Sequence, residues 1–390
     1  MGALLQFVLL FVCWLAALAT LLVFLETWVG LSNRSRFIAR RASGTYGVIT
    51  VFIPMHGSRE KVERTIRSVY GQSYPFIEIV LIHHEEDHHL AGLAKEFRLI
   101  RSHIPVRVVP TIFPIDSHSD RIRALEHAQP AARGRWFVTL EPDVLLDRFA
   151  IEAAVEFAGS NDVCALALHP GIRCRSAVQS MIAPSMEQLF QIVRIASRRR
   201  EKQNKAEFDA SFLILEREAF EVVNRINRMP GILNESGWSL WAYQVEGFRT
   251  FQADGSRSMW RNANIRTWYS DTEVNRRYGR ISAPLMVMSA ALSFIPAFGI
   301  GFGLIHGVGD FNGASILAFA GVSYLLMWVS YFLFARRLYA AVWFAPFWIV
   351  SQLPAAALTL WEMRRLSRQK AVGAVYDRAR NVTIKDRGRS

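Results

Sequence analysis

Apolar residues are concentrated towards the two ends of this chain. Residues 3–25 form one continuous apolar run, and residues 284–308, 313–334 and 338–360 form three more. A helix needs about 20 predominantly apolar residues to cross the hydrocarbon core of a bilayer. The pattern therefore predicts an N-terminal transmembrane helix and a group of C-terminal membrane segments, with a soluble domain between them.

Basic residues indicate how these segments are oriented. Arg34, Arg36 and two further arginines follow the first run and no Lys or Arg precedes it, a pattern that opposes a cleaved signal peptide. By the positive-inside rule the N-terminus lies outside and the soluble domain lies in the cytosol. The arginines at 364, 365 and 368 predict a cytosolic tail as well.

The last apolar segment creates a conflict of parity, because three C-terminal spans would carry the basic tail outside. Pro346 and Pro354 interrupt this segment, and proline removes helix hydrogen bonds. We therefore predict a re-entrant or broken hairpin at 338–360. The expected organisation is residues 1–30 as a transmembrane helix, 31–283 as a cytosolic domain, 284–362 as membrane segments and 363–390 as a basic cytosolic tail.

The middle of the chain alternates between two hydrophobic patterns. Residues 48–53, 77–82, 106–109 and 136–140 are short β-branched or aromatic runs, as in buried parallel strands. Between the first two, valine and isoleucine recur at helical spacing. This alternation predicts an α/β domain with a mostly parallel sheet. Ligands of such sheets bind outside the carboxyl ends of the strands, so functional residues are expected there.

Composition and charge narrow the classes of protein. The chain has 390 residues, three cysteines and a net charge of +13. So few cysteines give no disulfide framework and suit a reducing cytosol. The positive charge lies where the positive-inside rule already requires it and no nucleic-acid motif accompanies it, so no nucleic-acid partner is expected. The basic run 197–205 follows an amphipathic stretch, which suits the anionic surface of the cytoplasmic leaflet or a solvated helix end.

Two polar segments follow predicted strands. Glu141 and Asp143 come directly after the fourth strand and can present oxygens to Mg²⁺ or Mn²⁺, which in turn would hold a diphosphate. The alternative is a helix cap or a solvent-facing pair. Residues 83–89 read HHEEDHH, for which we predict a polar loop rather than a transition-metal site, because the spacing matches no closed zinc site. No glycine-rich loop follows the first strand, which opposes dinucleotide and P-loop binding.

Several short motifs occur in a characteristic order. They are Pro54 after the first strand, Gln72-x-Tyr74-Pro75, Arg121 ahead of Ala124-Leu125, Glu141-Pro142-Asp143, and Ser211-Phe212-Leu213 ahead of Arg217-Glu218-Ala219. Their order resembles the membrane-bound family 2 glycosyltransferases, which have the GT-A fold and include ceramide glucosyltransferase. The resemblance implies a GT-A-like nucleotide-sugar-binding domain, a nucleotide-sugar donor and a divalent metal, Mg²⁺ or Mn²⁺, on Glu141 and Asp143.

The resemblance also identifies substrate-binding residues, although the chain departs from the family at several of them. His83 and His84 stand where the family usually has an aspartate that contacts the base. The family's Gln-x-x-Arg-Trp appears only as residues 274–278, so Arg276, Arg277 and Tyr278 would hold the diphosphate or the acceptor. The alternative for these arginines is a juxtamembrane collar that meets anionic lipid. The remaining substrate-binding residues implied by the resemblance are Pro54 and Arg121.

The largest departure concerns the general base. The family's Glu-Asp motif falls on Glu235 and Ser236, and a serine cannot take a proton at neutral pH without a partner of its own. Both are retained as the catalytic candidates, with Glu235 able to replace the missing carboxylate.

We therefore expect a multi-pass inner (plasma) membrane, hexosyltransferase-like enzyme with a cytosolic domain. It would move a sugar, with inversion, from a nucleotide-sugar donor to a lipid-linked or membrane-embedded acceptor. The alternative from another class is a catalytically inactive scaffold in an envelope polysaccharide or glycolipid assembly, acting with partner subunits. A transporter is opposed by the size of the soluble domain, and a processive synthase by the small number of spans.

Overall fold

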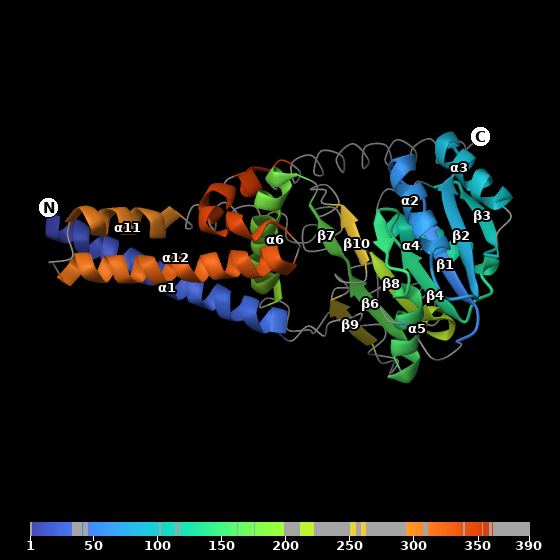
Figure 1. The fold of residues 1–390 in the computed structure, drawn as a ribbon, viewed down its shortest axis with the longest axis horizontal. Coiled ribbons are helices and arrows are strands. Elements are labelled where there is room, and N and C mark those ends of the chain that lie inside the picture. Colours follow the sequence, from blue (N-terminus) through green and yellow to red (C-terminus); the bar gives the residue numbers. More distant parts are fainter. Residues whose placement is uncertain are drawn as a thin grey trace, which may run out of the picture.

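The computed structural model consists of a long bundle of apolar helices and an α/β domain beside one end of it (Figure 1). It describes residues 2–32, 46–100, 103–113, 118–161, 163–174, 176–198, 211–221, 250–254, 259–262, 294–306, 311–337, 340–352 and 354–358, together with the single residues 41, 115 and 361.

The domain is organised around a seven-stranded sheet with the order β3-β2-β1-β4-β8-β6-β9. The neighbours from β3 to β4 are all parallel, whereas β8 runs antiparallel to both β4 and β6. The mostly parallel α/β domain predicted from the sequence is confirmed. The strands are β1 (Ile49–Pro54), β2 (Ile77–His84), β3 (Val106–Thr111), β4 (Trp136–Leu140), β6 (Ala165–His169), β8 (Phe212–Glu216) and β9 (Thr250–Asp254).

Helices cover both faces of the sheet, which explains why its central strands are buried and mostly apolar. All six residues of β1 are buried. Alternate residues of β1 pack with the apolar sides of α2 and α3 in one cluster, while Phe52 packs with Phe137 and α4 on the opposite face. The helices of the domain are α2 (Arg59–Tyr70), α3 (His88–Leu99), α4 (His118–Ala128), the short η1 (Gln129–Ala131) and α5 (Ala150–Ser160).

A second, smaller sheet adjoins the carboxyl end of β4. Its order is β5-β10-β7, with β5 (Val144–Leu146), β10 (Met259–Asn262) and β7 (Gly171–Arg173). β5 begins directly after Asp143, and α6 (Ala177–Arg198) follows β7. Along the chain, β5 and β7 therefore lie between the acidic pair and the helix that contacts the bundle, whereas β10 follows that helix.

The bundle contains α1 (Gly2–Ser32), α11 (Phe294–His306) and α12 (Phe311–Arg337). The helices approach closely at small residues. A methyl group added to Gly299 of α11 would lie 2.9 Å from both Cys13 of α1 and Ala320 of α12. Among the described residues, two helices are long and apolar enough to cross a membrane, Leu4–Leu25 within α1 and Asn312–Arg336 within α12, while the described part of α11 is shorter.

Two short helical pieces are described within the segment predicted as a broken hairpin. It contains a 3₁₀ helix, η2 (Val342–Phe347), and a short apolar helix, Trp348–Leu358. Both lie at the end of the bundle that faces the domain, beside α6 (Figure 1). The amide of Gln352 donates to Gln188 of α6 at 3.1 Å, and the hydroxyl of Tyr331 in α12 donates to the carbonyl of Met181 at 2.8 Å.

Candidate active site

The order of the strands identifies the edge at which a ligand is expected. From β1 the chain moves outward to β2 and β3, and then returns to place β4 on the other side of β1. This reversal makes the carboxyl ends of β1 and β4 a topological switch point, which is where open α/β sheets bind ligands.

The acidic pair lies in a tight turn at this point. The backbone N–H of Val144 donates to the carbonyl of Glu141 at 3.1 Å, so residues 141–144 form a β-turn with Pro142 and Asp143 as its central residues. Proline is favoured at the first central position because its φ is already fixed. The N–H of Glu141 donates to the carbonyl of Ser211 at 3.0 Å, which ties the turn to the start of β8. Glu141 and Asp143 are both buried.

A histidine from the neighbouring strand end contacts the first carboxylate. His56 follows β1 by two residues, and its Nε2 lies 3.1 Å from Oε2 of Glu141. Because a carboxylate oxygen accepts, Nε2 carries the hydrogen and donates it. The contact spans the switch point between β1 and β4. The sequence analysis did not select His56, although its position just beyond the first strand was the available signal.

The donor set at this edge suits a hard divalent cation. Glu141 and Asp143 offer carboxylate oxygens, the ligands that Mg²⁺ prefers, and Mg²⁺ commonly uses one or two carboxylates together with substrate phosphates and waters. In the described part of the chain no group of three or more His, Cys, Asp and Glu side chains is placed to hold a metal. The site therefore fits a cation shared with a bound diphosphate better than an all-protein metal cage.

The polar loop predicted over residues 83–89 is shorter than expected, because His83 and His84 belong to β2 and α3 begins at His88. Asp87 caps α3, its side chain accepting from the N–H of Leu90 at 3.0 Å. His83 is buried in β2, and its Nδ1 donates to the carbonyl of His84 at 2.9 Å. Pro54, His83 and His84 end their strands at the same edge as the acidic turn.

The remaining predicted site residues cannot be added to this geometry. Glu235, Ser236, Arg276, Arg277 and Tyr278 lie outside the described residues. Arg121 lies in α4, but its side chain is likewise outside the description.

Other motif residues have structural roles. Gln72 donates to the carbonyl of Asp147 at 2.7 Å and accepts from the N–H of Ile151 at 3.1 Å, so it joins α2 to α5. Tyr74 donates to the carbonyl of Gly47 at 2.7 Å, and burial raises the pKa of its hydroxyl. Arg217 donates to the carbonyls of Ala132 and Gly134, which precede β4. These motif positions therefore hold together the scaffold of the site.

Comparison with known families gives this site its context. Residues 50–223 match the model of Glycosyl transferase family 2, a stretch that runs from β1 to just beyond β8. The matched stretch contains β1, His56 and the acidic turn.

Two solved structures are similar to this chain at low sequence identity. The mannosyltransferase PcManGT from Pyrobaculum calidifontis, in complex with GDP-Man and Mn²⁺, is 15% identical with a TM-score of 0.46, covering 91% of this chain and 99% of that chain. S. aureus TarS 1–349, solved also with UDP-GlcNAc, is 12% identical with a TM-score of 0.37, covering 83% of this chain and 92% of that chain. No curated protein matches the sequence.

Proposed function

We propose that this chain is a membrane-anchored inverting glycosyltransferase that moves a sugar from a nucleotide-sugar donor to a lipid-linked or membrane-embedded acceptor. The observation that carries the proposal is the family 2 match over residues 50–223, which includes the acidic turn at the switch point. The matched stretch contains the acidic turn and the carboxyl ends of β1 and β4. Open α/β sheets bind ligands at that edge.

The chemistry of sugar transfer suggests a role for each candidate residue. Glu141 and Asp143 would hold a divalent cation, which when bound supplies charge stabilisation to the leaving diphosphate. Inversion requires direct displacement at the anomeric carbon, with a base on the face opposite the leaving group. Glu235 is the carboxylate we assign to that role, since Ser236 needs a partner to take a proton. Arg276 and Arg277 would pair with phosphate oxygens.

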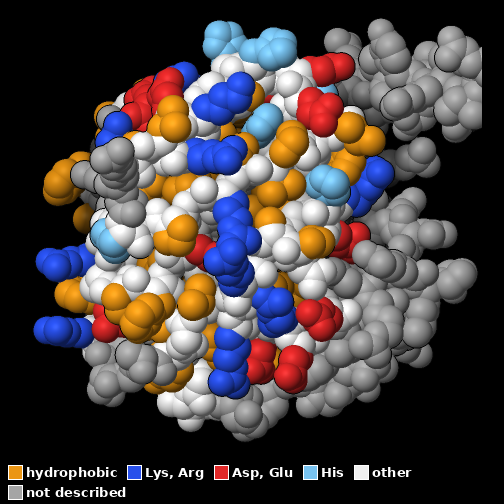
Figure 2. Space-filling model, turned by 90° about the vertical axis from the view of Figure 1, so that its right-hand side faces the viewer, with side chains coloured by type: hydrophobic (Ala, Val, Ile, Leu, Met, Phe, Trp, Pro, Cys, Tyr) orange, Lys and Arg blue, Asp and Glu red, His pale blue; other side chains and the backbone are white. Residues whose placement is uncertain are grey.

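The contrast between the two parts of the molecule supports membrane anchoring. Leu4, Phe7 and Phe11 of α1 are more than half exposed along an apolar helix. On the domain surface farthest from the bundle, Lys and Arg side chains are instead interspersed with acidic side chains and with small apolar patches (Figure 2). Apolar side chains exposed along a spanning length are stable in lipid and costly in water.

We also propose that α1 is retained and that α11 and α12 cross as a hairpin, with residues 340–358 on the cytosolic side. Cys13 of α1 packs against Ile316 and Ala320 of α12, a contact that a removable signal sequence would not need. A cysteine introduced at Lys370, in a chain without its natural cysteines, should react with an impermeant reagent only after cells are permeabilised. Labelling from outside intact cells would refute this topology.

The experiment that tests the activity uses the full chain purified in detergent with Mn²⁺ or Mg²⁺. A panel of nucleotide sugars is offered with membrane lipid extract as acceptor, and release of the nucleotide and labelled lipid are measured. We expect turnover with at least one donor, and Asp143→Asn should lower it by about 100-fold or more, because a cation contributes several kcal/mol of charge stabilisation. The matched control is Asp87→Asn, a change at the cap of α3.

The alternative of an inactive scaffold subunit is favoured by one observation, the serine at position 236 where the family has its base. Calorimetry with Mn²⁺ or Mg²⁺ and with UDP or GDP separates the two. Binding without turnover would favour a nucleotide-binding scaffold, whereas neither binding nor turnover would refute the glycosyltransferase proposal.

A further inference from the structure

His56 is the side chain at the switch point to which the sequence motifs assign no role. It lies just past the end of β1, and its ring nitrogen Nε2 contacts Oε2 of Glu141 at 3.1 Å. The two residues are 85 positions apart in the sequence and meet only because β1 and β4 are neighbours in the sheet. The contact is therefore a product of the fold at the edge where the ligand is expected.

We infer that His56 is a positioning residue for Glu141, and that it holds this carboxylate in the orientation needed to bind the cation and diphosphate of the donor. The inference rests on the proposed function, because it assigns a role within that same site. It adds a residue that neither the acidic motif nor the family match selects.

The backbone around the pair explains why a side-chain restraint is needed there. Pro142 restricts the residue before it to an extended backbone, and the hydrogen bonds of Glu141 to Ser211 and Val144 fix its main chain. These contacts act on the main chain, whereas the contact with His56 acts on the carboxylate. Ordering a glutamate side chain is entropically unfavourable, and the hydrogen that His56 donates to Oε2 helps to set the orientation of the carboxylate.

The backbone on both sides of His56 has a defined conformation. Gly57, the next residue, has a φ of +81°, a left-handed conformation that favours glycine. The N–H of Met55 donates to the carbonyl of Ile82 at 2.7 Å, which extends the pairing of β1 with β2 up to the residue before His56. His56 thus stands on a rigid strand end directly before a turn, as a residue with a positioning role should.

The chemistry of the contact also argues for positioning rather than for direct metal binding by the histidine. Nε2 donates to Glu141, so it is not available as a metal ligand in this arrangement, and the described residues hold no three-ligand group. Groups that hydrogen-bond to a metal ligand orient it, and their loss typically lowers metal affinity or activity 10- to 100-fold.

The test compares three full-length variants in detergent, using Mn²⁺ with UDP and Mn²⁺ with GDP as the probes. His56→Ala removes the donor, His56→Gln keeps an N–H at about the same reach, and His103→Gln changes an exposed histidine at the opposite edge of the sheet. We expect His56→Ala to weaken binding of the Mn²⁺–nucleotide pair about 10-fold or more. His56→Gln should recover most of this loss, and His103→Gln should bind as the wild type does.

A kinetic readout separates positioning from a general structural role. The Mn²⁺ concentration that gives half-maximal turnover should rise about 10-fold in His56→Ala, whereas kcat at saturating Mn²⁺ should change much less. Unfolding of His56→Ala should occur within a few degrees of the wild type, since the side chain lies at a loop.

Each outcome decides the question. If His56→Ala binds the Mn²⁺–nucleotide pair as tightly as the wild type does, this inference alone is overturned. The same holds if His56→Gln binds the pair as weakly as His56→Ala does. Wild-type protein that binds neither probe overturns the proposed function, and the role of His56 fails with it.

Discussion

Two buried glutamates at opposite edges of the same sheet have different surroundings. Glu78 lies at the amino-terminal edge, where its carboxylate accepts from the hydroxyl of Thr50 at 2.6 Å and from the N–H of Arg133. Glu141 lies at the carboxyl-terminal edge, where its carboxylate accepts from His56. The first set of partners holds strands and a loop together, whereas the second joins two strand ends at the switch point.

The comparison teaches that burial of a carboxylate does not identify its role. Both glutamates are less than one tenth exposed. What differs is the edge of the sheet, because open α/β sheets bind ligands beyond the carboxyl ends of their strands and not at the other edge. We therefore assign Glu78 to stability and Glu141 to donor binding.

The same substitution at both positions tests this assignment. Glu141→Gln should lower turnover about 100-fold, because an amide is a poorer ligand than a carboxylate for a hard cation, with little change in the melting temperature. Glu78→Gln should lower the free energy of unfolding by about 1 to 2 kcal/mol, since its buried partners lose a charged acceptor. Nucleotide release and thermal unfolding are measured on both variants. Loss of turnover in Glu78→Gln without loss of stability would contradict the comparison.

Gly134 allows a second test of the amino-terminal edge. Its N–H donates to the hydroxyl of Thr50 at 2.9 Å, and a methyl group at this position would lie 2.5 Å from the backbone nitrogen of Thr50. Gly134→Ala should therefore destabilise the domain by about 2 kcal/mol, the usual range for overpacking. Denaturant unfolding measures the change.

The control is Gly92→Ala. Gly92 lies within α3, and a methyl group added there would meet no atom within 4 Å. An added alanine there should be neutral or stabilising by about 0.5 kcal/mol. If Gly92→Ala were as destabilising as Gly134→Ala, the close packing of the amino-terminal edge would not be the cause.

Much of the sheet could be predicted because its central strands are buried on both faces. β1, β2 and β4 are rich in β-branched and aromatic residues, with few polar positions, which is typical of such strands. The small sheet was not predicted, because β5 and β7 have three residues each and are too short to show a period. β10 pairs with both from more than 80 residues further along the chain, a distance that local patterns do not encode.

The candidate site was predictable only in part, and for a related reason. Glu141 and Asp143 belong to one local turn, so their placement followed from the strand before them. The contact between His56 and Glu141 depends on β1 lying next to β4, and hydrophobic periodicity gives no strand order. The capping role of Asp87 at the start of α3 is a local feature and could have been predicted. It was missed because the histidines around it drew attention to metal binding instead.

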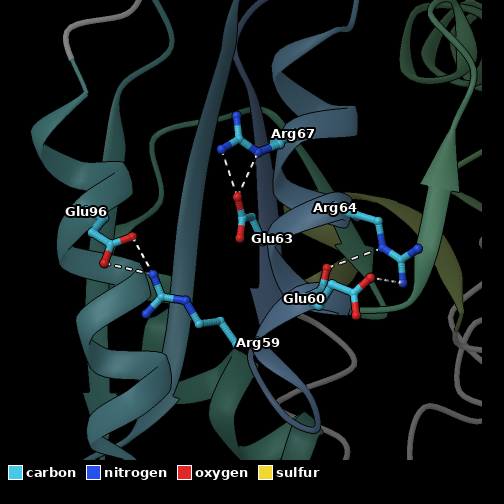
Figure 3. A network of polar contacts seen from close by, with 6 residues as sticks. All are labelled: Arg59, Glu60, Glu63, Arg64, Arg67 and Glu96. Atoms are coloured by element: carbon cyan, nitrogen blue, oxygen red, sulfur yellow. Dashed lines mark hydrogen bonds and ion pairs between the residues drawn. The ribbon is translucent and has the colours of Figure 1, made fainter.

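The smallest expected effect concerns the surface beside the carboxyl-terminal edge. Arg59, the first residue of α2, contacts Glu96 of α3 at 2.6 Å, and two further pairs lie within α2 (Figure 3). Both partners are exposed, so side-chain entropy and salt screening offset most of their attraction. Arg59→Ala and Glu96→Ala, alone and combined, should each shift the melting temperature by about 1 °C or less, and the shift should vanish at high salt. A larger coupling that persists at high salt would mean that the packing of α2 against α3 depends on this ion pair. The position of the loop that carries His56 would then depend on a surface contact more than on the pairing of β1. We expect the strand pairing of β1 with β2 and β4 to dominate, because those backbone hydrogen bonds are buried and the ion pair is not.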